Sequence, residues 1–417
     1  MSGKKKLTTL LSLVLAITLL LAGCQDGADR QGDNEKTEGS HTIGVAVYSQ
    51  SDPEMRMFMD YYRSYIAASF PVEFIFSELL YTTEDEVDFI QAAKEAGAEG
   101  IISFYGLDLE EIVAACEQAE MYYVLGSASI SDTDFDAVKD NPWFLGVIGP
   151  ADEEEFAAGS EMAMNFARQG AASYLIVSGG AAGVGNFMHY SRVEGMLTAL
   201  RDELGLTYSR EIAELAAAEE LTIVDTGNPE VSIVISPGYA QLDSGAANLR
   251  QAFAQGDYDA LLCAQGVSDV IEDIKSEISA SETSMLMGVV DCFSEENYMA
   301  VEYTDTKGNA LLNYVKGKYA SMVAPAFVAM YNALEGDLDV IRSDGEAFRL
   351  YQSYWTAASE EEYVELYGYT QSIYENAYSS IDLMQVIKSY NADADFGQFK
   401  ALTEACDMDS VRARIGE

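Results

Sequence analysis

From residue 42 onward, short apolar runs alternate with longer amphipathic segments, and this alternation most constrains the fold of the chain. Strands that alternate with helices form right-handed βαβ units, whose parallel sheet is covered by helices on both faces. In the first half, the pattern predicts strands at 42–48, 72–77, 100–104 and 122–125. The helices predicted between them are 55–69, 83–96 and 109–119.

The alternation of strands and helices is interrupted at residues 142–149 and then resumes. Here the pattern predicts helices at 153–169, 192–204, 246–254, 267–277 and 324–334, and strands at 173–177, 231–235, 260–263, 285–290 and 348–355. We therefore expect an α/β protein with two doubly wound, Rossmann-like lobes. Residues 357–417 are rich in tyrosine and have helical periodicity without a strand run, so we expect a helical extension.

The N-terminus carries a different signal. Lys4, Lys5 and Lys6 precede an apolar run that ends in Leu21-Ala22-Gly23-Cys24. A basic region, an apolar region and small residues before a cleavage site are typical of a secretory signal peptide. The cysteine makes the segment similar to a bacterial lipoprotein signal, in which that thiol is lipidated. We expect a signal peptide at 1–23, lipidation of Cys24 on the extracytoplasmic face of the cell membrane and a flexible spacer at 24–41. The apolar run is short for a transmembrane anchor.

Composition narrows the possible partners. The formal net charge is −45, with 69 acidic and 24 basic residues, so nucleic acid and anionic lipid are poor partners. The other cysteines, Cys116, Cys263, Cys292 and Cys406, are too scattered to suggest zinc. Buried free thiols are expected, with a Cys263–Cys292 bridge as the alternative. Residues 178–185 are glycine-rich but lack the Lys-Ser/Thr of a phosphate-binding loop. We expect neither a bound cofactor nor a bound metal.

Five short motifs occur in an order that resembles the type I periplasmic binding proteins, in particular the ribose- and galactose-binding branch of ABC-transporter solute receptors. They are Thr42-Ile43-Gly44-Val45-Ala46-Val47 with Asp52-Pro53, Gly97-Ala98-Glu99-Gly100-Ile101-Ile102, Arg192-Val193-Glu194-Gly195-Met196, Asp257-Tyr258-Asp259-Ala260-Leu261-Leu262 and Gly288-Val289-Val290-Asp291. The resemblance covers about residues 42–356. It implies lobe 1 at 42–147 with 320–345 and lobe 2 at 148–319 with 346–356. A three-strand hinge would cross near 146–150, 318–322 and 343–347.

Ligands of open parallel sheets bind beyond the carboxyl ends of the strands. Polar and aromatic residues at those ends in this chain predict a ligand site, and the candidates are Gln50, Asp52, Phe104, Tyr105, Ser127, Arg192, Gln265 and Asp291. The resemblance places Arg192, Gln265 and Asp291 where the family grips its sugar. Arg192→Ala is expected to weaken binding without unfolding the protein. The family's paired aromatic residues fall on Glu54 and Met55 here, which makes sugar specificity an open question and favours a neutral or cationic ligand.

The resemblance implies a monomeric, non-enzymatic receptor that captures a small polar solute, a sugar or a related compound, by hinge closure and delivers it to the permease of an ABC importer. A sensory receptor that signals to a membrane histidine kinase is the alternative. A secreted hydrolase is weaker, because the chain has only His41 and His189 and lacks a Gly-x-Ser-x-Gly motif.

Overall fold

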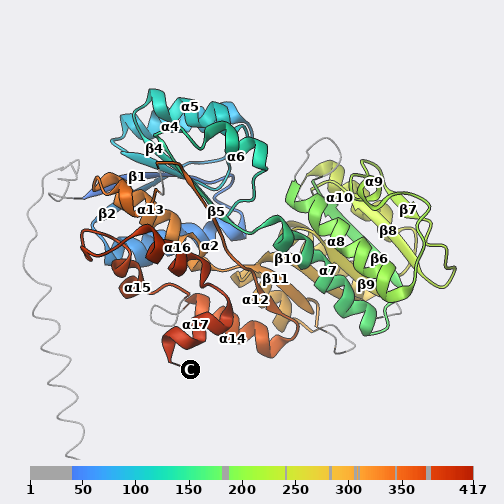
Figure 1. Ribbon diagram of the computed structural model, residues 1–417. Coiled ribbons are helices and arrows are strands. Elements are labelled where there is room, and N and C mark those ends of the chain that lie inside the picture. Colours follow the sequence, from blue (N-terminus) through green and yellow to red (C-terminus); the bar gives the residue numbers. More distant parts are fainter. Residues whose placement is uncertain are drawn as a thin grey trace, which may run out of the picture. The chain divides into compact units, whose positions relative to one another are not determined.

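The computed structural model describes residues 40–180, 187–239, 242–280, 284–304, 308, 310–342, 345–371 and 377–416 (Figure 1). The predicted signal peptide, Cys24 and the spacer up to residue 39 lie outside the described residues, as does most of the glycine-rich loop, 181–186. Within the described part, the strands form two sheets.

The first sheet is parallel throughout, with the strand order β12-β5-β4-β3-β1-β2. We call this sheet and its helices lobe 1. Its strands are β1 (His41–Ala46), β2 (Val72–Phe76), β3 (Gly100–Ser103), β4 (Tyr122–Gly126), β5 (Phe144–Gly149) and β12 (Phe348–Tyr351). Its helices are α2 (Pro53–Tyr61), continued by a π-helical turn (Tyr62–Ile66) and α3 (Ala67–Ser69), then α4 (Thr83–Glu95), α5 (Leu109–Gln118), α6 (Asp132–Val138) and α13 (Ala324–Leu334).

The second sheet has the order β13-β11-β10-β9-β6-β8-β7, with antiparallel strands only at its two edges. We call this sheet and its helices lobe 2. Its strands are β6 (Ser173–Gly179), β7 (Thr222–Val224), β8 (Ser232–Pro237), β9 (Ala260–Cys263), β10 (Leu286–Cys292), β11 (Tyr314–Lys318) and β13 (Trp355–Ala357). Its helices are α7 (Asp152–Arg168), α8 (Phe187–Leu204), α9 (Ile212–Ala216), α10 (Asp243–Phe253), α11 (Ile271–Ala280) and α12 (Glu295–Glu302).

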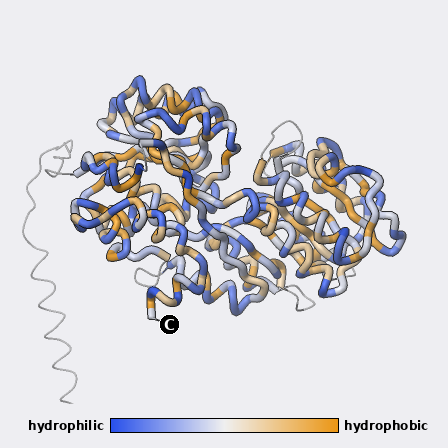
Figure 2. The backbone as a smooth tube through the Cα atoms, viewed as in Figure 1, coloured by the Kyte–Doolittle hydropathy of each residue, from blue (hydrophilic) through white to orange (hydrophobic). Residues whose placement is uncertain are grey.

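The inner strands β1, β3, β4 and β5 of lobe 1 are buried on both faces, which explains why they are mostly apolar. Successive side chains of a strand point to opposite faces, so Ile101 packs in the core beneath α4 and α5, whereas Ile102 packs in the core on the α2 and α13 side. Figure 2 shows the apolar residues concentrated along the strands and the polar ones on the outer helices. The predicted α/β class with two doubly wound lobes is confirmed.

The chain passes between the two sheets three times, after β5, after β11 and between β12 and β13. The first two passages lie where the sequence predicts them. The third lies at residues 352–354, later than the predicted 343–347, and it divides the predicted strand 348–355. Side chains from Phe348 to Tyr354 alternate between buried and more exposed positions without a break. Local periodicity therefore shows no boundary between the two short strands, although they belong to different sheets.

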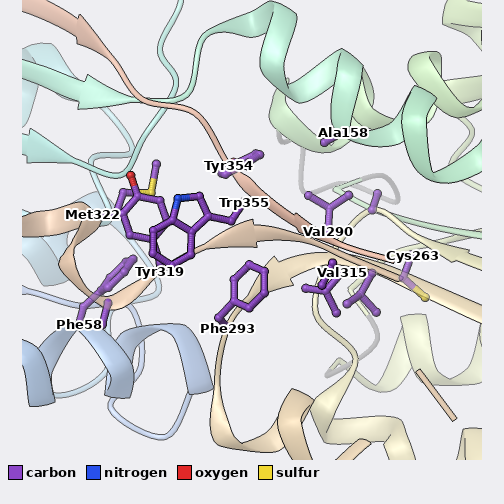
Figure 3. Packing of buried hydrophobic residues seen from close by; sticks show 14 of the residues in the cluster. Phe58, Ala158, Cys263, Val290, Phe293, Val315, Tyr319, Met322, Tyr354 and Trp355 are labelled. Carbon is purple, nitrogen blue, oxygen red and sulfur yellow. The ribbon is translucent and has the colours of Figure 1, made fainter. Parts of the chain in front are cut away.

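Residues after β13 form the predicted helical extension, which comprises α14 (Glu360–Gln371), α15 (Ser380–Gln385), α16 (Phe396–Glu404) and α17 (Met408–Ile415). It packs on residues of the third passage, where Trp355 Nε1 donates to the Cys406 carbonyl (2.9 Å) and Gln352 Nε2 donates to Tyr378 Oη (3.0 Å). Figure 3 shows Trp355 stacked on Tyr319, whose ring centroid is 4.0 Å away. The extension is therefore part of the hydrophobic core.

Helices α7 and α8 approach so closely that Gly159 has no room for a side chain. A Cβ atom there would lie 1.8 Å from the Arg192 carbonyl oxygen. We expect Gly159→Ala to destabilise the protein by about 1–3 kcal/mol or more, because the two helices must separate. Gly368→Ala is the control, since nothing lies within 4 Å of its Cβ position in α14; it should be neutral or slightly stabilising. Equal denaturation midpoints for the two variants would contradict this prediction.

Cys116, Cys263, Cys292 and Cys406 are free and buried, as expected, and the alternative Cys263–Cys292 bridge is not formed. No helix in the described part of the chain is long and apolar enough to cross a membrane.

Candidate functional site

Asp52 lies in the loop that follows β1 and is the N-cap residue of α2. Its Oδ1 accepts hydrogen bonds from the backbone N–H groups of Glu54 (2.9 Å) and Met55 (3.2 Å), and Pro53 occupies the first turn. This is a helix N-cap followed by proline, a strong local start signal. Tyr48 Oη also donates to Oδ1 (2.9 Å). Burial, and then the neighbouring Glu54, raise the pKa of Asp52 to about 6.

Lys318, the last residue of β11, lies between the two lobes. Its ammonium group donates to Glu54 Oε1 (2.8 Å) in α2 and to the Ser127 carbonyl (3.2 Å) after β4. The Lys318 side chain is only 8% exposed. Sequence reasoning missed Lys318 as a site residue, although a lysine at the end of a strand that is otherwise buried is a usable signal.

Ser127 has a left-handed backbone, with φ of 56°. This conformation is uncommon for a residue with a side chain, and such residues cluster at functional sites. It is buried, and its Oγ has no hydrogen-bond partner among the described residues. The strained turn directs the Ser127 carbonyl at Lys318.

Asp291 extends from the carboxyl end of β10 in lobe 2. Its Oδ2 accepts from Asn297 Nδ2 (2.7 Å), and Gly266 leaves room for the carboxylate, since a Cβ atom there would lie 2.8 Å from Oδ1. Burial raises the pKa of Asp291 to about 7, Asn297 opposes the rise, and Asp52 and Glu54 add to it. The negative charges of Asp52 and Glu54 in lobe 1 therefore disfavour ionisation of Asp291 in lobe 2.

Arg192 is buried between residues of lobe 2 and Tyr354 of the third passage. Its Nε donates to Glu155 Oε2 (2.6 Å), Nη1 to the Ala264 carbonyl (2.7 Å) and Nη2 to Tyr354 Oη (3.0 Å). Tyr354 in turn donates to Glu155 Oε1 (2.8 Å). Arg192 is 5% exposed. Its contact with a ligand stays a prediction, whereas its internal role is plain: it ties the end of β9 to the third passage.

The other four predicted residues lie in different surroundings. Gln265 is buried after β9, and its Nε2 has no partner among the described residues. Gln50 is exposed and donates to the Ser77 carbonyl (2.7 Å). The Phe104 ring packs in the core against Phe58, with the centroids 5.1 Å apart. Burial, and then Glu86, raise the pKa of Tyr105 to about 12, and Tyr239 of lobe 2 also raises it.

The structure thus relates Asp52, Ser127 and Asp291 through Glu54 and Lys318, which the predicted set lacked. Arg192 and Phe104 are buried and contact other residues of the protein, and their contact with a ligand stays a prediction. In the part of the chain that the structure describes, no cluster of three or more His, Cys, Asp or Glu residues could hold a metal ion.

A cavity of about 450 Å³ lies elsewhere, lined by α2, the start of α12 and α14. Arg56 of α2 and Glu296 of α12 form an ion pair at its wall. None of the eight predicted residues lines this cavity.

No protein-family model matches this chain, and no curated protein matches it. Solved structures do match. One is the periplasmic binding protein component of the arabinose ABC transporter from Shewanella sp. ANA-3, bound to α- and β-L-arabinofuranose (14% identity, TM-score 0.54, covering 79% of this chain and 95% of that chain).

Two further solved structures are similar. A galactofuranose-binding protein has 13% identity and a TM-score of 0.55, over 79% of this chain and 99% of that chain. An ABC transporter solute-binding protein from Bacillus halodurans C-125 with bound myo-inositol has 13% identity and a TM-score of 0.54, over 80% and 99%. At such identities the likeness concerns the fold, and this chain has the two-lobe fold of the type I periplasmic binding proteins.

Proposed function

We propose that this protein is a lipid-anchored, extracytoplasmic receptor that binds a small polar solute between its lobes and delivers it to an ABC importer. The observation that carries the proposal is the set of half-buried and buried polar side chains at the strand ends of both lobes, which Lys318 at the end of β11 links to Glu54 in α2 and to the Ser127 carbonyl after β4. A ligand that contacts both lobes binds the closed state more tightly than the open state. This difference in affinity shifts the equilibrium toward closure.

The fold neighbours support this class of function by analogy. Those structures contain arabinofuranose and myo-inositol, and two of the proteins are components of ABC transporters. Delivery to a permease and lipidation at Cys24 belong to the proposal. A sensor that presents its closed form to a histidine kinase would use the same hinge, and the two partners are distinguished by which membrane protein the closed form binds.

A thermal-shift screen of residues 24–417 with Cys24→Ser tests the receptor function. Sugars, polyols, amino acids, nucleosides and polyamines are each added in excess. A ligand that binds only the folded state stabilises it by about 2.7 kcal/mol at a concentration of 100 Kd, which raises Tm by several degrees. No shift with any compound would contradict the receptor function.

A further inference from the structure

Among the charged side chains described above, the carboxylates outnumber the cations. Lys318 is paired with Glu54 (2.8 Å), and Arg192 is paired with Glu155 (2.6 Å). Each of these cations therefore already has a carboxylate within hydrogen-bond distance. Asp52 and Asp291 remain as one carboxylate from each lobe.

Neither remaining carboxylate has a cationic partner among the described residues. Among the described residues, Asp52 accepts from Tyr48 Oη and two backbone N–H groups, and Asp291 accepts from the Asn297 amide and interacts with the Cys292 thiol. Unpaired carboxylates are costly away from water. Lys318 relates the two carboxylates in space, because it binds Glu54, two residues after Asp52, and pairs across β10 and β11 with Cys292, the residue after Asp291. Their negative charges repel each other, and Asp52 and Glu54 both raise the pKa of Asp291. A positive charge between them would remove both costs.

Two uncharged polar side chains at neighbouring strand ends are also without a partner among the described residues. Ser127 Oγ and Gln265 Nε2 are more than nine-tenths buried and make no hydrogen bond within the described residues. Ser127 contacts Lys318 through its carbonyl, and Gln265 precedes Gly266, whose Cα faces the Asp291 carboxylate. A buried Nε2 donor requires an acceptor, which a hydroxyl or carbonyl oxygen of a ligand would supply.

We propose that the solute is a small organic cation, an amine that also carries hydroxyl or carbonyl groups, with its ammonium group held between Asp52 and Asp291. The inference rests on the receptor function proposed above. The ammonium group would bridge one carboxylate of each lobe, so the same contact that selects the ligand also favours closure. Ser127 and Gln265 would hydrogen-bond to its uncharged part.

Matched probes that differ in a single ammonium group test this inference. Titration calorimetry at pH 7 compares glucosamine with glucose, and 1-amino-1-deoxyglucitol with glucitol. We expect the amine of at least one pair to bind tenfold or more tightly than its neutral analogue. Asp52→Asn and Asp291→Asn should each remove this preference, and asparagine retains the helix cap at position 52. Glu110→Gln, an exposed position on α5, removes the same charge and should leave the preference intact.

The pH dependence is a second readout. Affinity for 1-amino-1-deoxyglucitol, whose amine remains protonated, should rise from pH 5 to pH 8. Over this range Asp52 and Asp291 ionise, with pKa values of about 6 and 7. The other charged or titratable groups around them are Tyr48, Glu54, Cys263, Cys292, Lys318 and Tyr363.

The outcomes separate the two proposals. A neutral sugar or polyol that binds as tightly as its amine overturns the cationic ligand and leaves the receptor function standing. No binding by any probe, together with silence in the wider screen, overturns both. A preference that persists in both Asp52→Asn and Asp291→Asn overturns the assignment to these carboxylates, and the two variants are independent should one of them fail to fold.

Discussion

Replacing Arg192 with methionine should lower the free energy of unfolding by about 3–5 kcal/mol, because the change leaves Glu155 as an uncompensated buried carboxylate. Glu155 is fully buried, and the Ala264 carbonyl and the Tyr354 hydroxyl lose their donor as well. The prediction drawn from sequence, that Arg192→Ala weakens binding without unfolding the protein, takes no account of this loss of stability. Chemical denaturation monitored by circular dichroism measures the loss.

The double variant Arg192→Met with Glu155→Leu provides the control. Removing both charges leaves no unpaired ion, so its loss should be clearly smaller than the sum of the two single losses. Additive losses, or a loss below about 1 kcal/mol for Arg192→Met, would show that the pair contributes little. Ligand titration of the same variants, at a temperature where they are folded, then tests the predicted contact of Arg192 with the solute.

Truncation after Ala358 should abolish the folded state. It removes large, almost fully buried side chains, namely Tyr363, Tyr378, Leu383, Ile387 and Phe399. Burial of each is worth about 1.5–3 kcal/mol, so their combined loss is comparable to the whole stability of a protein, about 5–15 kcal/mol. It also uncovers Trp355 and removes its acceptor, the Cys406 carbonyl.

A shorter truncation after Asp407 is the matched control, since it removes α17 but keeps the hydrogen bonds from Trp355 to Cys406 and from Gln352 to Tyr378. It removes the buried Val411 and the Arg414 guanidinium that lies over the Tyr378 ring. We expect this protein to fold with a lowered Tm and the longer truncation to be insoluble or unfolded. Soluble yield, near-ultraviolet circular dichroism and Tm are compared. A protein ending at Ala358 with an unchanged Tm and unchanged ligand affinity would show that the extension is dispensable.

Strand ends were predictable because they depend on local pattern. The apolar runs mark β1, β3, β4, β9 and β10, and the rule for parallel sheets then selects the polar residues that follow. Asp52 and Asp291 were predicted in this way; in the structure Asp52 caps α2 ahead of Pro53, and Asp291 accepts from Asn297. Phe104 was selected by the same rule but turns into the core against Phe58, because the rule gives a position along the chain and not the direction of a side chain.

The sequence alone determined the α/β class, the two doubly wound lobes and the helical extension, because hydrophobic periodicity is a property of neighbouring residues. Only the tertiary structure decided that residues 348–357 enter two different sheets, that Lys318 pairs with Glu54 and that Arg192 is neutralised by Glu155. These pairings join residues 37 to 264 positions apart. Their partners are set by how the strands are ordered in space, and that order decides which carboxylates remain without a cation.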